Sequence, residues 1–143
     1  IVILSFVPQD CGDPCAELQT ALAAVQAQVN ISPMKELIVF VTVQDTDIRI
    51  ETTWDESNWT LAVLANGETV ASAADRFNVL SKRGGTLPMV HVLDRLGRHA
   101  GIFHGADFRK TNLTLYVNGL INNVHAHRSP VKKSWWDRLM NWF

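Results

Sequence analysis

Short apolar runs alternate along the chain with stretches of helical periodicity. Five runs rich in β-branched and aromatic residues are predicted as strands, at residues 1–7, 37–43, 59–64, 89–93 and 99–104. Three stretches repeat apolar residues every three or four positions and are predicted as helices, at residues 16–29, 67–79 and 109–122. The polar stretch 44–58 fits neither pattern, so we treat it as a variable insertion.

Local signals place the helix ends and one turn. Asp13 is the expected N-cap of the first helix with Pro14 at its first helical position, and Asn66 is the expected cap of the second. The stretch from Asp94 to Gly97 is expected to form a hairpin turn with a positive φ at the glycine. The positions expected to face the core are Leu18, Leu22 and Val25, then Val70, Ala74 and Phe77, and finally Leu113, Val117 and Leu120.

The order of these elements predicts a thioredoxin-like α/β fold. It reads β-α-β, an insertion with one extra strand, and then α-β-β-α. The first three elements form a right-handed parallel crossover, and the later hairpin with its closing helix completes the domain. We therefore expect one domain over residues 1–124, with a central mixed β-sheet flanked by helices.

The last residues do not fit that domain. Residues 125–133 are predicted as a linker, and 134–143 as a Trp-rich amphipathic helix with Trp135, Trp136 and Trp142 on its apolar face. Such a helix suits a membrane surface or a membrane-protein partner. A terminal helix that folds back on the domain is the alternative.

Composition limits the possible functions. Of 143 residues, 47% are hydrophobic and 19% are charged, which are values typical of a folded domain rather than a disordered chain. The formal net charge is −1, so no broad basic surface is available and no nucleic-acid partner is expected.

The candidate chemistry lies in two cysteines, Cys11 and Cys15, at the turn between the first strand and the first helix. Amides at a helix N-terminus favour thiolates, and thiolates attack disulfides or bind Cu(I). The neighbouring Asp10 and Asp13 oppose thiolate formation and attract cations, which favours metal handling over a strongly oxidising pair. A purely structural role, as buried cysteines or as a disulfide, is the remaining interpretation.

The first strand, the C-x3-C turn and the crossover resemble the Sco/SenC family of copper-handling proteins. Three further stretches are similar to that family: LIVFVTVQD at 37–45, WTLAVLANGETVASAADRFNV at 59–79 and MVHVLDRLGR at 89–98. The resemblance implies that Cys11 and Cys15 are copper ligands or a redox pair. It also implies a periplasmic or extracytoplasmic, membrane-associated protein that supports assembly of a respiratory oxidase, with a membrane respiratory complex or oxidase subunit as partner.

The chain departs from that family where the third copper ligand is expected. Thr86 stands at the position matching the family's histidine, and Ala16 stands where a proline follows the second cysteine. The sequence Leu87-Pro88-Met89 instead resembles the cis-proline loop of ResA- and TlpA-type thiol-disulfide oxidoreductases.

The histidines of the chain provide few candidates for the missing third copper ligand. Met89 and His91 are the nearest candidates along the chain, although His91 is expected to be a hydrogen-bonded core residue. His99 and His104, on the return strand of the hairpin, are expected at the surface.

Two alternative functions use the same features. In a thiol-disulfide oxidoreductase, Cys11 would be the more exposed, attacking thiol and Cys15 the resolving one. In a non-catalytic accessory subunit of a membrane respiratory complex, the copper site would be lost, as Thr86 and the Trp-rich segment suggest.

Overall fold

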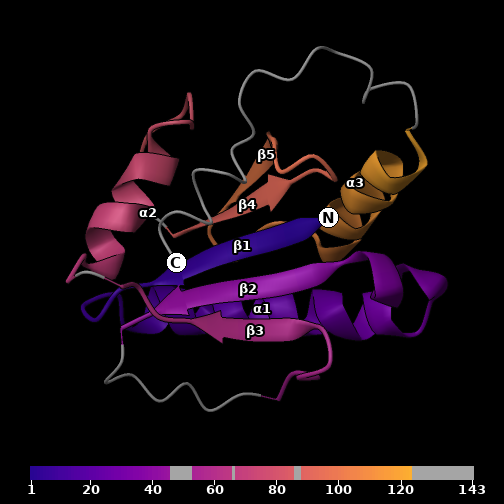
Figure 1. Ribbon diagram of the computed structural model, residues 1–143, viewed down its shortest axis with the longest axis horizontal. Coiled ribbons are helices and arrows are strands. Elements are labelled where there is room, and N and C mark those ends of the chain that lie inside the picture. Colours follow the sequence, from indigo (N-terminus) through magenta and orange to yellow (C-terminus); the bar gives the residue numbers. More distant parts are fainter. Residues whose placement is uncertain (46–52, 66, 86–87, 124–143) are drawn as a thin grey trace.

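Within the residues that the structure describes, five strands form one mixed sheet in the order β3-β2-β1-β4-β5, with helices on both faces (Figure 1). The structure is a computed structural model, and it describes residues 1–45, 53–65, 67–85 and 88–123. The predicted thioredoxin-like α/β arrangement is confirmed. The elements are β1 (Val2–Val7), α1 (Asp13–Asn30), the short 3-10 helix η1 (Pro33–Leu37), β2 (Val39–Gln44), β3 (Trp59–Ala62), α2 (Val70–Asn78), β4 (Met89–Leu93), β5 (His99–His104) and α3 (Lys110–Asn122).

Strand pairing follows the expected topology. β1 runs parallel to β2, and β2 runs parallel to β3, which is the extra strand expected from the insertion. β4 runs antiparallel to both β1 and β5. The β1-α1-β2 crossover therefore brings the end of β1, where the cysteines follow, to the centre of the sheet.

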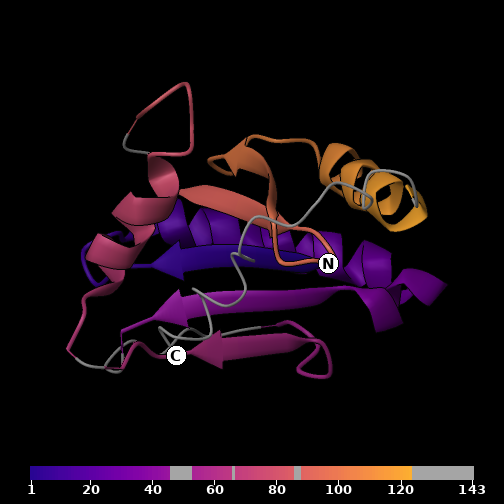
Figure 2. The same cartoon turned by 45° about the horizontal axis from the view of Figure 1, so that its top comes forward.

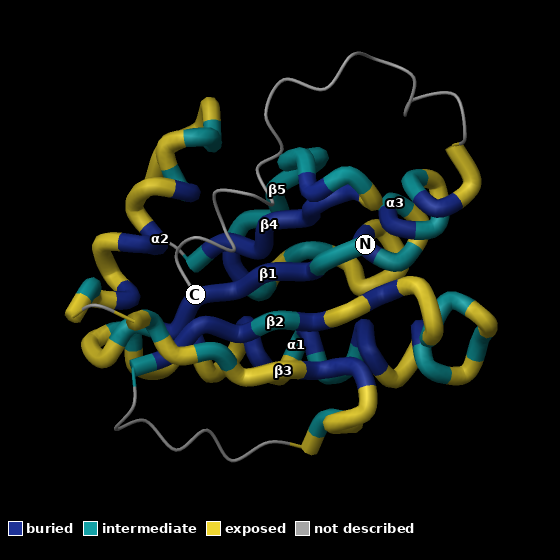
Figure 3. Tube along the Cα trace, in the orientation of Figure 1, coloured by how far each residue is buried: buried dark blue, intermediate teal, exposed yellow. Residues whose placement is uncertain are grey.

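Two hydrophobic cores lie on opposite faces of the sheet. The larger core lies under α1 and α3 and contains Leu18, Leu22, Leu113 and Val117, each at most 1% exposed. The smaller core lies under α2, which stands beside the ends at which β1, β2 and β3 finish (Figure 2). The helix faces predicted to point inward are those that are buried (Figure 3), except that Ile121 is buried where Leu120 is only partly so.

The first helix begins differently from the prediction. Its N-cap is Gly12, with φ 62°, and Asp13 is already the first helical residue. The Gly12 carbonyl accepts the first helical hydrogen bond from Ala16 N at 3.2 Å, and no side chain caps the helix. The prediction of Asp13 as the N-cap was wrong because the turn needs a positive φ, which glycine adopts without strain.

The second helix also begins later than expected. Thr69 is its N-cap, and the Thr69 hydroxyl accepts a hydrogen bond from Ser72 N at 3.2 Å. Gly67 has φ 69°, a left-handed conformation that keeps it outside the helix. The predicted cap, Asn66, lies outside the described residues.

The hairpin turn is confirmed. One carboxylate oxygen of Asp94 accepts hydrogen bonds from Leu96 N at 2.9 Å and from Arg98 N at 3.0 Å. Gly97 has φ 70°, as the turn requires. None of the helices in the described part of the chain is long and apolar enough to cross a membrane.

Candidate redox and metal site

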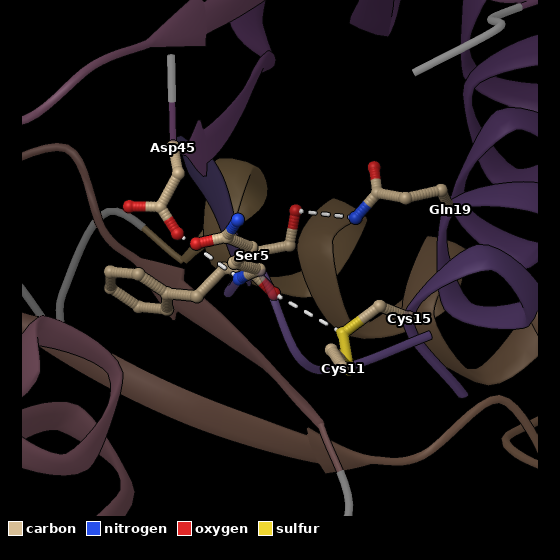
Figure 4. The surroundings of a disulfide bond; sticks show 7 residues. Ser5, Cys11, Cys15, Gln19 and Asp45 are labelled. Carbon is tan, nitrogen blue, oxygen red and sulfur yellow. Dashed lines mark hydrogen bonds between the residues drawn. A yellow bond between two sulfur atoms is a disulfide. The ribbon is translucent and has the colours of Figure 1, made fainter. Parts of the chain in front are cut away.

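The two cysteines are joined in a disulfide that links the loop after β1 to the first turn of α1 (Figure 4). Their Cα atoms are 5.7 Å apart. The loop turns sharply because Cys11 N donates a hydrogen bond to Pro8 O at 3.1 Å. The fold thus brings together both residues that the sequence singled out, at the N-terminus of a helix.

The two sulfur atoms differ in access. Cys15 is 1% exposed, whereas Cys11 is partly exposed. The Cys15 Sγ lies 3.8 Å from the carbonyl oxygen of Phe6. After reduction, that carbonyl is in place to accept a hydrogen bond from the Cys15 thiol, so the buried sulfur has a partner as a neutral thiol. Attack from outside must therefore involve Cys11.

Carboxylates surround the cysteine loop. Asp10 and Asp13 are exposed beside it. Asp45, directly after β2, accepts a hydrogen bond from Gln9 N at 3.0 Å and ties the loop to the neighbouring strand (Figure 4). The loop that holds the accessible sulfur therefore carries two carboxylates and contacts a third.

A buried polar cluster, which the sequence analysis missed, supports the site from below. Gln19 lies one helical turn after Cys15 and donates a hydrogen bond to Ser5 Oγ at 3.1 Å (Figure 4). Thr42 Oγ1 lies 3.0 Å from Ser5 Oγ and donates to Gln19 Oε1 at 3.1 Å. Trp59 Nε1 donates to the same Thr42 oxygen at 2.9 Å. Polar residues inside otherwise apolar strand and helix faces were the signal available in the sequence.

A pocket of about 150 Å³ opens beside the disulfide. In the described part of the chain, its polar lining residues Asp75 and Asn78 come from α2. Both cysteines line it as well. Its apolar lining residues are Phe6, Pro8, Ala71, Ala74, Pro88 and Met89.

His91 is buried in the core, as expected, and both of its ring nitrogens are engaged. Nε2 lies 3.3 Å from Asn78 Oδ1, and Nδ1 lies 3.1 Å from His99 Nε2. Because the amide oxygen only accepts, Nε2 of His91 carries the hydrogen and Nδ1 accepts from His99. Burial, with added repulsion from His99 and His104, lowers the pKa of His91 to about 3.

His99 does not lie at the surface as predicted. It is half-buried, and its ring contacts that of His91 at a centroid distance of 5.3 Å. A register irregularity between Val92 and Leu93 pairs Leu93 with His99 and so turns the His99 side chain to the same face as His91. His104 is also only partly exposed, and its Nε2 lies 2.6 Å from Ser81 Oγ.

Sulfur ligands are the donors available for a soft metal ion. Met89, 3% exposed, lines the same pocket as both cysteines. Two thiolates and a thioether suit Cu(I). Among the described residues, no three or more His, Cys, Asp or Glu side chains are grouped so that they could hold a metal ion. Thr86 and Leu87, in the loop where the third ligand was sought, lie outside those residues.

Two solved structures resemble this chain over most of its length. A SCO1/SenC family lipoprotein from Bacillus anthracis str. Ames matches 85% of this chain and 81% of its own, with a TM-score of 0.62 and 15% sequence identity. BsSco, a member of the Sco family of cytochrome c oxidase assembly proteins in which a disulfide switch was identified, matches 83% of this chain and 78% of its own, with a TM-score of 0.61 and 9% identity.

These similarities define the fold class. The chain has the thioredoxin-like fold of Sco proteins, so the resemblance predicted from the sequence is confirmed at the level of the fold. No protein-family model matches the sequence. No curated protein matches it either.

Proposed function

We propose that this chain carries out thiol-disulfide exchange or carries Cu(I) through Cys11 and Cys15, in support of the assembly of a respiratory oxidase. The observation that carries the proposal is a disulfide at a helix N-terminus with one accessible sulfur beside a pocket. The likeness to BsSco, a member of a family of cytochrome c oxidase assembly proteins, supports an oxidase as the partner.

Thiol exchange follows from the difference in burial. In the reduced protein, the Cys11 thiolate attacks a partner disulfide, forms a mixed disulfide and expels one partner thiolate. Cys15 then gives up its proton and attacks the Cys11 sulfur, which releases the second partner thiolate and restores the Cys11–Cys15 bond. The protein dithiol is oxidised by two electrons, and the partner disulfide is reduced to two thiols.

Copper handling would use the same residues in the reduced protein. Cu(I) is then cargo, held by Cys11 and Cys15 with Met89 as the third donor. Its delivery to a partner requires access from the pocket, and Cys11 provides that access.

The second candidate is a thiol-disulfide oxidoreductase without copper. The engagement of His91 with Asn78 and His99 favours it, because this histidine could bind copper only by giving up a buried hydrogen bond. In that case, Cys11 and Cys15 act only in exchange.

A place on the extracytoplasmic side of a membrane is part of the proposal. The lipoprotein among the similar structures supports it. We assign membrane or partner attachment to residues 134–143, which follow the proposed linker 125–133, although both stretches lie outside the described residues. A non-catalytic accessory subunit of a membrane respiratory complex would attach through the same residues.

Anaerobic titration of the reduced protein with Cu(I), against a competing chelator, separates these candidates. The copper proposal expects one-to-one binding that is lost in Cys11→Ser and weakened in Met89→Leu. His91→Gln, a control outside the donor set, should bind as the unaltered protein does. Binding no stronger than that of Cys11→Ser would overturn the copper role and leave thiol exchange.

A further inference from the structure

We propose that the pocket beside the disulfide docks the partner segment that carries the reactive cysteine, and that Asp75 selects a partner with a lysine or arginine next to that cysteine. The proposal rests on thiol exchange as the proposed function and names the chemistry of the partner. It assigns one occupant to the pocket, an apolar side chain followed by a basic residue and the cysteine.

The walls and size of the pocket suit an apolar side chain. Phe6 and Met89, which line the pocket, are at most 6% exposed, and Ala71, Ala74 and Pro88 add small apolar surfaces. The volume of about 150 Å³ resembles that of engineered apolar cavities that hold a benzene-sized group. An aliphatic side chain of the partner therefore fits beside the disulfide.

Charge decides what should lie next to that side chain. Asp75 is the one charged residue among the described residues that line the pocket, and it is exposed. Asp10, Asp13 and Asp45 add negative charge around the cysteine loop. A cation on the partner is attracted to this opening and an anion is repelled, with the modest strength of exposed charge pairs.

Asn78 gives the pocket a fixed hydrogen-bond donor. Its Oδ1 is engaged by His91 Nε2 at 3.3 Å, which orients the carboxamide. The amide N–H groups are then left to donate, and a backbone carbonyl of a docked segment is a suitable acceptor. His91 is thus a positioning residue for Asn78.

The test uses short peptides in which a single cysteine is joined by a disulfide to thionitrobenzoate. One peptide reads Leu-Lys-Cys, a second Leu-Glu-Cys and a third Gly-Lys-Cys, each with blocked ends. The Cys11 thiolate of the reduced protein attacks the peptide sulfur, and thionitrobenzoate leaves with the bonding electrons. Cys15 then displaces the peptide thiol and closes the Cys11–Cys15 disulfide. Absorbance of the released thionitrobenzoate gives the rate, and the leaving group is the same in every case.

The expected rates follow from the charges. At low ionic strength, the Leu-Lys-Cys peptide should react roughly fivefold faster than Leu-Glu-Cys, and this ratio should fall to about twofold in Asp75→Asn. Glu36→Gln is the matched control, because Glu36 is exposed in η1, after the far end of α1, and the ratio should not change there. The Gly-Lys-Cys peptide should react more slowly than Leu-Lys-Cys, because it lacks the side chain that contacts the apolar walls, and equal rates would overturn the docking role of the pocket.

The test distinguishes a failure of the docking proposal from a failure of thiol-disulfide exchange. If no peptide releases thionitrobenzoate faster than with Cys11→Ser, thiol exchange itself is wrong. If all peptides react at one rate, or if Asp75→Asn and Glu36→Gln give the same ratio as the unaltered protein, the exchange stands and the docking proposal is overturned.

Discussion

The two cysteines of the disulfide are chemically unequal. Cys15 is buried against the Phe6 carbonyl, and Cys11 faces the pocket with part of its surface exposed. Reactivity of a thiol depends on access as well as on the thiolate fraction. Attack on a partner disulfide is therefore assigned to Cys11, and resolution of the mixed disulfide to Cys15.

Alkylation of the reduced protein tests this assignment. Iodoacetamide should modify Cys11 roughly tenfold or more faster than Cys15, because Cys15 reacts only when the structure opens locally. Mass spectrometry of the peptides measures both rates. In urea the difference should vanish. Equal rates in the folded protein would contradict the assignment.

His91 makes the stability of the protein depend on pH. Its pKa is lowered from 6.5 to about 3, so the folded state keeps the ring neutral while the unfolded chain takes up a proton below pH 6.5. Stability is therefore full above about 6.5 and is lost as the pH falls toward 3, at up to about 1.4 kcal/mol per pH unit.

Urea unfolding at two pH values checks this dependence. Between pH 7 and pH 5 the protein should lose about 2 kcal/mol through His91 alone. The variant His91→Gln cannot titrate and should lose correspondingly less over the same interval. An unchanged loss in the variant would show that other groups, among them His99, cause it.

The roles of individual residues can be predicted from the sequence to different degrees. Cys11 and Cys15 are visible because a strand, a turn and a helix start surround them within a few positions. The contact between His99 and His91 depends on a register irregularity in the β4–β5 ladder, which no local pattern announces. Without this irregularity, Ala100 would pair with Leu93 in the ladder.

At the scale of elements, α1 connects the site to the sheet. Its residue Gln19 joins β1 through Ser5 and β2 through Thr42, and Trp59 of β3 completes the cluster. Buried polar groups are costly when left unpaired, so each member depends on the others. The cluster holds the first turns of α1, and hence Cys15, against three strands.

Removal of one hydroxyl tests the cluster. Thr42→Val keeps the shape of the side chain but leaves the Trp59 Nε1–H without an acceptor and the Gln19 Oε1 without its donor, so the free energy of unfolding should fall by roughly 2 to 3 kcal/mol. Thr60→Val, at an exposed position of β3, is the matched control and should change it by less than about 0.5 kcal/mol. Chemical denaturation measures both. Equal effects would contradict the role of the cluster.

The elements themselves were largely readable from the sequence. Apolar runs marked the strands because they are buried on one or both faces. The helix starts were less readable, because Gly12 and Gly67 adopt positive φ values that separate loop from helix. Side-chain capping preferences say little about such backbone turns.

At the scale of the whole molecule, the topology followed from the β-α-β crossover and the hairpin. The pocket did not, because its walls come from the end of β1, the cysteine loop, α2 and the start of β4. That segments so distant in sequence lie side by side can be predicted only when the order of the strands in the sheet is known. The site is therefore a product of the fold, with the cysteines as its one local signature.

The central claim is that Cys11 and Cys15 form a working thiol pair rather than a structural bond. The most direct measurement is a redox titration in graded glutathione buffers, with free thiols trapped by alkylation and counted by mass. The expected midpoint potential lies between about −270 and −120 mV, the range of thiol-disulfide exchange proteins. A midpoint below about −300 mV, typical of structural disulfides, would contradict it.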